Sequence, residues 1–276
     1  MEQNGNQQII DKTAVGKAFD SYVEGYNIED PKIKLKYTHT RRVASLSEEI
    51  ARSIKNSMGL EDNDIDLAWL IGMLHDIGRF EQVRRFGTFN DSVSVDHAEF
   101  GADLLFNPKE DDYFFEGQKE ALEIIRKNIP DTKLVETAIR NHNKYRVEEG
   151  LDDRTLLFAN IIRDADKVDI LKVNVEFDVE EIYNIPLEEL LNSDISQVVL
   201  DACLEGHAVN RALRLTPMDL VIGHASMMQE LVFEKSNEVV RQQGYLKILL
   251  DKPVKLEQTK EKLNIIKKHL SYLIEQ

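Results

Sequence analysis

The stretch that decides the fold is AWLIGMLHDIG, at residues 68–78. Residues 68–74 are apolar or glycine, and a helix that is apolar on every side is a buried one. This helix runs up to an adjacent imidazole and carboxylate, His75 and Asp76, and Gly78 is predicted to stop it. A soluble protein rarely places His-Asp at the end of a buried helix unless a site needs both kinds of ligand. We therefore predict a metal centre here.

The composition is that of a soluble, globular, all-α protein. Hydrophobic residues make up 42% of the 276 positions and charged residues 31%, which is ordinary for a folded chain. Six prolines and thirteen glycines interrupt the sequence, and apolar residues recur mainly at three- and four-residue spacing. No apolar run reaches the ~18 residues that a membrane span requires. We expect helices throughout and no contact with a membrane.

Cysteine content, the N-terminus and net charge bear on location and partners. A single cysteine, Cys203, excludes an intramolecular disulfide framework, and the polar N-terminus lacks the features of a signal peptide. Both favour a cytoplasmic protein. The formal net charge of −15 argues against a general electrostatic footprint for polymeric nucleic acid. A small anionic substrate, held in a locally basic pocket or on a metal, remains compatible with that charge.

A second histidine begins the apolar face of another predicted helix. His39 leads a stripe that continues through Val43, Leu46, Ile50 and Ile54, at steps of four, three, four and four. Residues at these steps share one helix face, so His39 is expected to point inward.

Further candidates lie at or near the ends of other predicted helices. His97 directly follows Asp96, which is a predicted N-cap. His142 shares an apolar face of its helix. Asp166 lies on an apolar stripe, whereas Asp164 lies on a more polar side of the same helix and stays the alternative ligand.

The donor types indicate which metals would suit the site. Imidazole and carboxylate ligands without thiolate favour Mn, Fe, Zn, Co or Ni, and a structural zinc site would usually recruit cysteines. Taken alone, His39 could be a satisfied core histidine, His97 an ordinary first-turn residue and His142 a surface residue. Their joint occurrence with His75 and Asp76 favours one centre to which several helices contribute.

The order H…HD…H…H…D resembles the HD superfamily of metal-dependent phosphohydrolases. The resemblance covers about residues 35 to 170, and the remaining ~100 residues carry no assigned motif. The matching fragments are THTRRV (38–43), LHDIGR (74–79), DHAEFG (96–101), NHN (141–143) and RDADK (163–167).

The resemblance implies a role for each matching residue. The four ligands shared across the superfamily correspond to His39, His75, Asp76 and Asp166. The extra pair found in members with two metals corresponds to His97 and His142, and Asp76 would then bridge the ions. Many relatives carry Lys where this chain has Arg79, which could hold a substrate phosphate bidentately. Lys167 is a further candidate for this role, and Arg79 could equally belong to a solvated loop.

The resemblance also implies an architecture and an activity. We expect an HD-domain helical bundle, with a helical lead-in over 1–30, a catalytic core over 31–175 and additional helices over 176–276 that could belong to the same domain. Residues 79–95 are predicted to form a long loop. A symmetric homodimer is compatible with the size of the chain.

The implied activity is hydrolysis of a phosphomonoester or phosphodiester in a small, nucleotide-derived molecule. Water activated by one or two divalent ions would attack phosphorus. Two alternatives stay open. The first is a mixed-valent di-iron oxygenase, since a branch of the superfamily uses the same ligands. The second is a nucleotide-sensing module that keeps the metal but has lost catalysis.

Overall fold

The chain is helical, as predicted. The computed structural model describes residues 8–109, 115 and 117–274, and these contain helices, turns and no strand. No helix among them is long and apolar enough to cross a membrane. The chain divides into two compact units, residues 1–165 and 166–276, with the division inside one long helix, α9.

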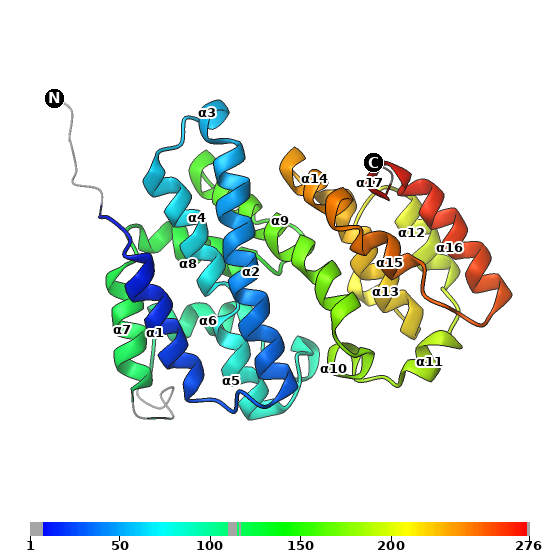
Figure 1. Cartoon of the computed structure of the whole chain (residues 1–276), viewed down its shortest axis with the longest axis horizontal. Helices are drawn as coiled ribbons and strands as arrows, with labels where there is room; N and C mark the ends of the chain where they lie inside the picture. Colours follow the sequence, from blue (N-terminus) through cyan, green and yellow to red (C-terminus); the bar gives the residue numbers. More distant parts are fainter. Residues whose placement is uncertain (1–7, 110–114, 116, 275–276) are drawn as a thin grey trace. The chain divides into compact units, whose positions relative to one another are not determined.

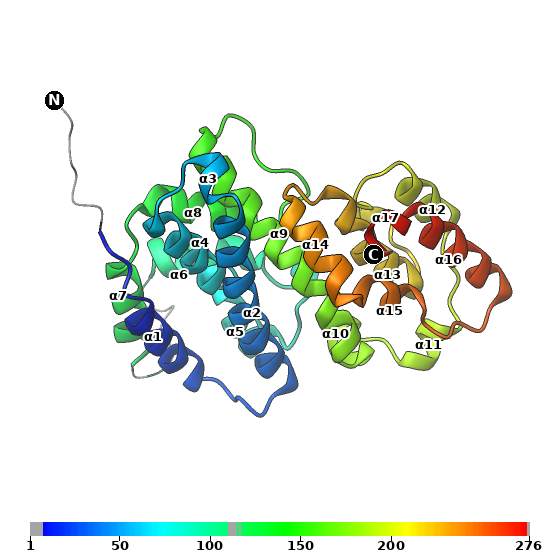
Figure 2. The same ribbon diagram turned by 45° about the horizontal axis from the view of Figure 1, so that its top comes forward.

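The described residues of unit 1 include five of the six predicted metal ligands and contain nine helices that precede α9, the 3₁₀ helix η1 included, and the first half of α9 (Figure 1). Their bounds are α1 Lys12–Glu24, α2 Pro31–Ser53, α3 Lys55–Met58, α4 Asp62–Leu74, α5 Ile77–Phe86, η1 Asp91–Val93, α6 His97–Phe106, α7 Gln118–Lys127, α8 Thr132–Asn141 and α9 Asp153–Glu176. Helices α2 and α4 pack extensively against each other and lie side by side in Figures 1 and 2.

Helix α4 is the buried apolar helix that the sequence predicts. Its N-terminus is closed by a capping box between Glu61 and Asp64, and Asp64 also accepts a hydrogen bond from Arg154 at 2.5 Å. Nearly every residue from Ile65 to Leu74 is buried. Its contact with α2 is close because Gly72 has no side chain: a Cβ built there would lie 2.6 Å from the Cα of Ala44.

The predicted loop over residues 79–95 is wrong in its first half. Helix α5 begins at Ile77 and continues to Phe86, and Gly87 ends it in the left-handed region at φ 65°. Ile77, Phe80 and Val83 recur every three residues and are buried, which gives α5 an apolar face despite its arginines. Gly78 therefore does not end α4 but lies inside α5.

Gly78 has a packing role. Helix α5 crosses α6 there, and a Cβ built on Gly78 would lie 2.5 Å from the carbonyl oxygen of His97 and 2.7 Å from the backbone nitrogen of Gly101. Both neighbours are backbone atoms, which cannot rotate away. The absence of a side chain thus lets α6 approach the end of α4 and brings His97 close to the His-Asp dyad.

Helix α1 packs against α5 through aromatic side chains. Phe19 and Tyr22 both meet the ring of Phe80 edge-on, with ring centroids 5.8 and 5.9 Å away. The hydroxyl of Tyr22 donates to the carbonyl oxygen of Ile77 at 3.1 Å. Aromatic contacts and one buried hydrogen bond thus hold the first turn of α5 in place.

Unit 2 contains the remaining helices of the described chain. They are α10 Val179–Tyr183, α11 Leu187–Leu191, α12 Gln197–Leu204, η3 Arg211–Leu213, α13 Pro217–Ser226, η4 Met227–Glu230, α14 Glu234–Gln243, α15 Tyr245–Leu250, α16 Glu257–His269 and α17 Ser271–Ile274. Helix α12 packs on α13 and α16, and Cys203 in α12 is buried. The predicted domain boundary at residue 175 stays a prediction.

Replacing Gly78 by alanine should destabilise the fold because the added methyl would overlap two backbone atoms of α6. We expect Gly78→Ala to lower the free energy of unfolding by about 1–3 kcal/mol, the usual range for overpacking. Gly16→Ala is the matched control, since a Cβ at this helical glycine meets nothing within 4 Å. It should raise stability by up to ~1 kcal/mol through helix propensity. Chemical denaturation measures both, and equal effects would contradict the packing role.

Candidate metal centre

The His-Asp dyad forms the junction between two buried helices. His75 is the C-cap of α4 and Asp76 is the N-cap of α5. Their exposed fractions are 0% and 2%. An ionised carboxylate is costly to bury without partners, so the contacts of Asp76 decide what this junction can do.

The two carboxylate oxygens of Asp76 face two different pairs of histidines. Oδ2 lies 3.5 Å from Nε2 of His39 and 3.4 Å from Nε2 of His75. Oδ1 lies 3.3 Å from Nε2 of His97 and 3.7 Å from Nε2 of His142. Asp76 therefore lies between two pairs of histidines. One pair comes from α2 and the end of α4, and the other comes from the start of α6 and the end of α8.

The nitrogen atoms within each pair are as close as two ligands of one ion. Nε2 of His39 is 3.4 Å from Nε2 of His75, and Nε2 of His97 is 3.0 Å from Nε2 of His142. Two nitrogens bound at ~2.0–2.1 Å to one ion, at roughly 90–110° to each other, are ~3.0–3.4 Å apart. The observed separations match this range.

The other ring nitrogens show that lone pairs point into the centre. Nδ1 of His75 lies 2.7 Å from the carbonyl oxygen of Gly72, and Nδ1 of His142 lies 2.7 Å from that of Ile139. A carbonyl oxygen only accepts, so both Nδ1 atoms carry a proton, and in the neutral ring Nε2 then carries a lone pair. This is the tautomer that a metal ligand requires.

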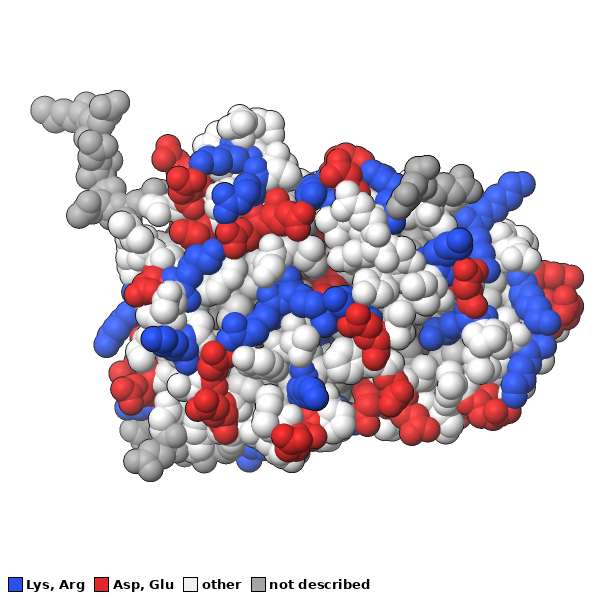
Figure 3. Space-filling model, in the orientation of Figure 1, with Lys and Arg blue, Asp and Glu red and all other residues white. Residues whose placement is uncertain are grey.

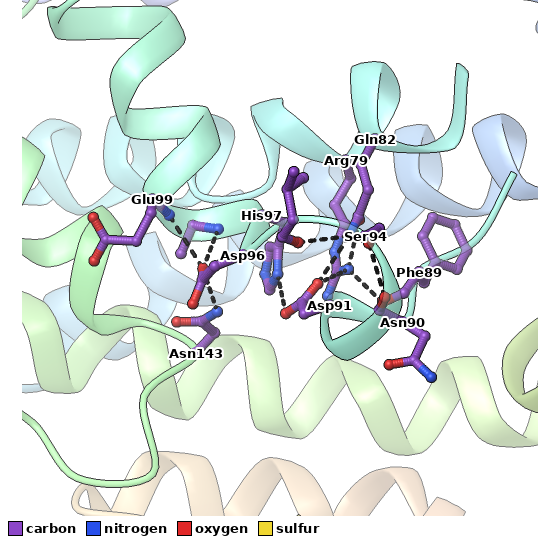
Figure 4. A network of polar contacts seen from close by, with 12 residues as sticks. Arg79, Gln82, Phe89, Asn90, Asp91, Ser94, Asp96, His97, Glu99 and Asn143 are labelled. Atoms are coloured by element: carbon purple, nitrogen blue, oxygen red, sulfur yellow. Dashed lines mark hydrogen bonds and ion pairs between the residues drawn. The ribbon is translucent and has the colours of Figure 1, made fainter. Parts of the chain in front are cut away.

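His97 is oriented by a carboxylate instead of a carbonyl. Its Nδ1 donates to Oδ2 of Asp91 at 2.8 Å (Figure 4). Burial lowers the pKa of His97 to about 3, and the charge of Arg79 acts in the same direction against the opposing pull of Asp91 and Asp76. The ring is therefore neutral at neutral pH, and its Nε2 lone pair faces that of His142. Two facing lone pairs repel unless a cation lies between them, so the residues present fit a metal ion.

Asp166 completes the group on the α2–α4 side. It directly follows Ala165 in the continuous helix α9, and ligand atoms of Asp166, His39 and His75 all lie within 4.8 Å of one another. Asp164 belongs to none of the candidate metal groups among the described residues, and it is fully buried. The geometry thus favours Asp166 of the two aspartates that the sequence leaves open.

Arg79 lies beside the centre, but much of its guanidinium group is engaged. Nη1 donates to the side-chain oxygens of Gln82 and Asp91, at 2.8 and 2.9 Å, and to the carbonyl oxygen of Phe89, at 2.8 Å (Figure 4). Its Nε lies 3.5 Å from Oδ1 of Asp76. Arg79 therefore holds the segment after α5 as well as contributing positive charge next to the dyad.

Lys36, one helical turn before His39, also contacts the dyad, although the sequence did not single it out. Its Nζ lies 2.6 Å from Oδ2 of Asp76 and 5.4 Å from the centroid of the Phe89 ring. Burial alone would raise the pKa of Asp76, but the positive charge of Lys36 acts in the opposite direction, and that pKa lies well below its usual range. The spacing of three from His39 places Lys36 on the same helix face and was the available signal.

Arg163 also went unassigned, although it lies in the RDADK fragment. This buried guanidinium of α9 donates to the carbonyl oxygens of Asn141, at 2.8 Å, and Lys144, at 2.6 Å. Asn141 is the last residue of α8, His142 is its C-cap, and Lys144 lies two residues beyond that cap. A cation at this end satisfies carbonyls that the helix leaves unpaired, and it fixes the turn that presents His142.

Lys167 has a different environment from Arg79. It is buried in unit 2, where its Nζ donates to the carbonyl oxygen of Glu230 at 3.3 Å and lies 3.9 Å from the carboxylate of the same residue. This pairing gives Lys167 a place in the packing of unit 2.

Comparison with known proteins identifies the family. The HD domain family model matches residues 37–171, which include all six predicted metal ligands. Residues 37–171 therefore contain an HD domain, and proteins of this domain family are generally metal-dependent phosphohydrolases. Searches of curated proteins and of solved structures gave no match.

The neutral state of His97 should make the stability of the metal-free protein depend on pH. The pKa of His97 is ordinarily 6.5 and is about 3 in the folded protein. Between these two pH values the unfolded chain binds a proton on His97 that the folded chain does not bind. The free energy of unfolding should therefore fall as pH is lowered through this window. Denaturation of the chelator-treated protein at several pH values measures the slope. His97→Gln should lower this slope, because it removes up to one proton from the difference in bound protons between the unfolded and folded states. Equal slopes in the variant and the wild type would contradict the assignment.

Proposed function

We propose that this protein is a phosphohydrolase with a dinuclear metal centre. The observation that carries the proposal is the position of Asp76, whose two oxygens face separate pairs of histidines. A carboxylate in this position can bridge two ions, whereas a mononuclear site would leave one pair of imidazole lone pairs without a cation. The family match supports the hydrolytic chemistry.

Six residues would hold the two ions. His39, His75 and Asp166 would bind one ion together with Oδ2 of Asp76. His97 and His142 would bind the other together with Oδ1 of Asp76. A pair of divalent ions such as Mn, Fe, Co, Ni or Zn supplies a water nucleophile of lowered pKa and neutralises charge on a phosphoryl group.

The protein itself would bind and orient the substrate. Lys36 and Arg79 bring positive charge to the side of the centre where both approach the ring of Phe89, at 5.4 and 5.6 Å from its centroid. Cations of this kind suit phosphate oxygens. The half-buried aromatic ring beside them supports an organic, nucleotide-derived phosphomonoester or phosphodiester as the substrate.

Surface charge supports a small substrate over a polymer. The net charge is −15, and on the face shown in Figure 3 Lys and Arg side chains are interspersed with Asp and Glu. Affinity for polymeric nucleic acid depends on many simultaneous cation–phosphate contacts. A few cations beside a metal centre are sufficient for one phosphate group.

Metal content should separate the two halves of the centre. The wild-type protein should contain two transition-metal ions per chain, and His97→Ala or His142→Ala should lower the count towards one. Asp76→Ala should affect both ions because it removes the proposed bridge. His207→Ala, at an exposed histidine, is the control and should retain both. Elemental analysis of purified variants measures the counts, and an unchanged count in His97→Ala would refute the dinuclear centre.

Activity should depend on the same residues. A screen of small phosphomonoesters and phosphodiesters with Mn²⁺, under anaerobic conditions, should detect phosphate-ester cleavage. Asp76→Asn should lower kcat/KM by at least about 100-fold, since loss of a direct ligand should exceed the loss typical of its supporting residues. Turnover that requires iron and O₂ would instead identify a di-iron oxygenase. Nucleotide binding without turnover under any metal would indicate a sensing module.

A further inference from the structure

The histidine at the start of α6 differs from its counterparts in what holds its ring. His75 and His142 stand at the C-terminal ends of helices, where the carbonyl three residues earlier, in the last turn of the same helix, accepts from Nδ1. His97 is the first residue of α6, so no preceding helical turn offers such a carbonyl. An acceptor for its Nδ1 must come from elsewhere, and Asp91 supplies it.

Asp91 is itself held rigidly from α5. While Oδ2 accepts from His97, Oδ1 accepts from Nη1 of Arg79 and from Nε2 of Gln82, both at 2.9 Å (Figure 4). Gln82 also donates to the carbonyl oxygen of Val95 at 3.0 Å. Two side chains of α5 thus secure Asp91 and the segment that leads into α6.

Asp91 could also be considered a metal ligand, because ligand atoms of Asp91, Asp96 and His97 lie within 4.8 Å of one another. The hydrogen bonds argue against this. Both oxygens of Asp91 already accept from side-chain donors. Asp96 caps α6 through the backbone nitrogen of Ala98, at 3.0 Å, and accepts from Asn143 at 2.9 Å. Both oxygens of Asp91 are therefore occupied by protein donors, and Oδ1 of Asp96 is occupied in capping α6, so Asp91 has an orienting role.

We propose that Asp91 is a positioning residue that presents Nε2 of His97 to the second metal ion and links this ion to Arg79. The inference rests on the proposed dinuclear centre. Asp91 fixes the proton on Nδ1, which leaves the Nε2 lone pair for the metal, and its negative charge makes the imidazole a stronger ligand. Because Arg79 binds the same carboxylate, the ligand and a cation beside the centre form one connected unit.

Asp91→Asn is the sharpest substitution because it preserves shape. An amide has one accepting oxygen and one donating NH₂ group, so it cannot accept from both His97 and the α5 donors. If the NH₂ group faces His97, the ring must carry its proton on Nε2, where the metal would bind. We expect the affinity for the second ion to fall by about 10–100-fold, the usual cost of losing such a partner. The affinity for the first ion should change by less than about threefold.

The measurement is calorimetric titration of the metal-free, full-length protein with Mn²⁺, which resolves two binding events. Asn90→Ala is the matched control. It removes hydrogen bonds to Ser92 in the same segment without touching His97, so it reports general loosening of that segment. Circular dichroism checks that each variant is folded. Asp91→Glu, which keeps the charge and two oxygens, should recover part of the lost affinity.

The combination with His97→Ala tests whether Asp91 acts through His97. If it does, Asp91→Asn should not weaken metal binding further once His97 has been replaced. Additive losses in the double variant would overturn the inference, as would wild-type affinity in Asp91→Asn or an equal loss in Asn90→Ala. Each of these results leaves the dinuclear centre intact if the wild type binds two ions. A wild type that binds no metal would overturn both proposals.

Discussion

The rest of unit 1 depends on one electrostatic constraint, which is the burial of the Asp76 carboxylate among four imidazoles. Three of the rings, those of His75, His97 and His142, have their Nδ1 atoms facing acceptors, so their Nε2 lone pairs point towards the carboxylate. Lone pairs and a carboxylate at 3.0–3.7 Å from one another repel, so this arrangement favours positive charge at the centre in addition to the ammonium group of Lys36. The surrounding helices are packed to impose this arrangement, which explains why the end of an otherwise apolar helix carries the dyad.

Backbone contacts at glycines make the arrangement sterically possible. Gly72 allows α2 to approach α4, which brings His39 next to His75, and Gly78 allows α6 to approach α5. Interiors are close-packed, so a single added methyl at either crossing would displace a ligand-bearing helix. Helix α1 lies outside the family match yet packs its aromatic side chains on Phe80, so the position of α5 depends on residues beyond the conventional domain limits.

Position within a helix decides how each histidine is oriented. A C-terminal histidine can use a carbonyl from its own last turn, and the sequence already indicates this by placing His75 and His142 at predicted helix ends. An N-terminal histidine such as His97 has no such carbonyl and requires an acceptor from another segment. In this protein the acceptor is Asp91, which also binds Arg79, so orientation of a ligand and placement of a cation depend on the same carboxylate.

The sequence by itself determined the helical class, the buried character of α4 and the six candidate ligands, because helical periodicity and the order of the motifs are local properties of the chain. It did not predict α5, because the arginines and Gly78 favoured a loop and the apolar face of this helix consists of only three residues. Lys36, Asp91 and Arg163 acquired their roles only in the tertiary structure. Their partners lie 6 to 40 residues away in sequence, and no periodicity specifies which side chains meet across helix ends and loops. Packing decides those contacts, and with them the geometry of the centre.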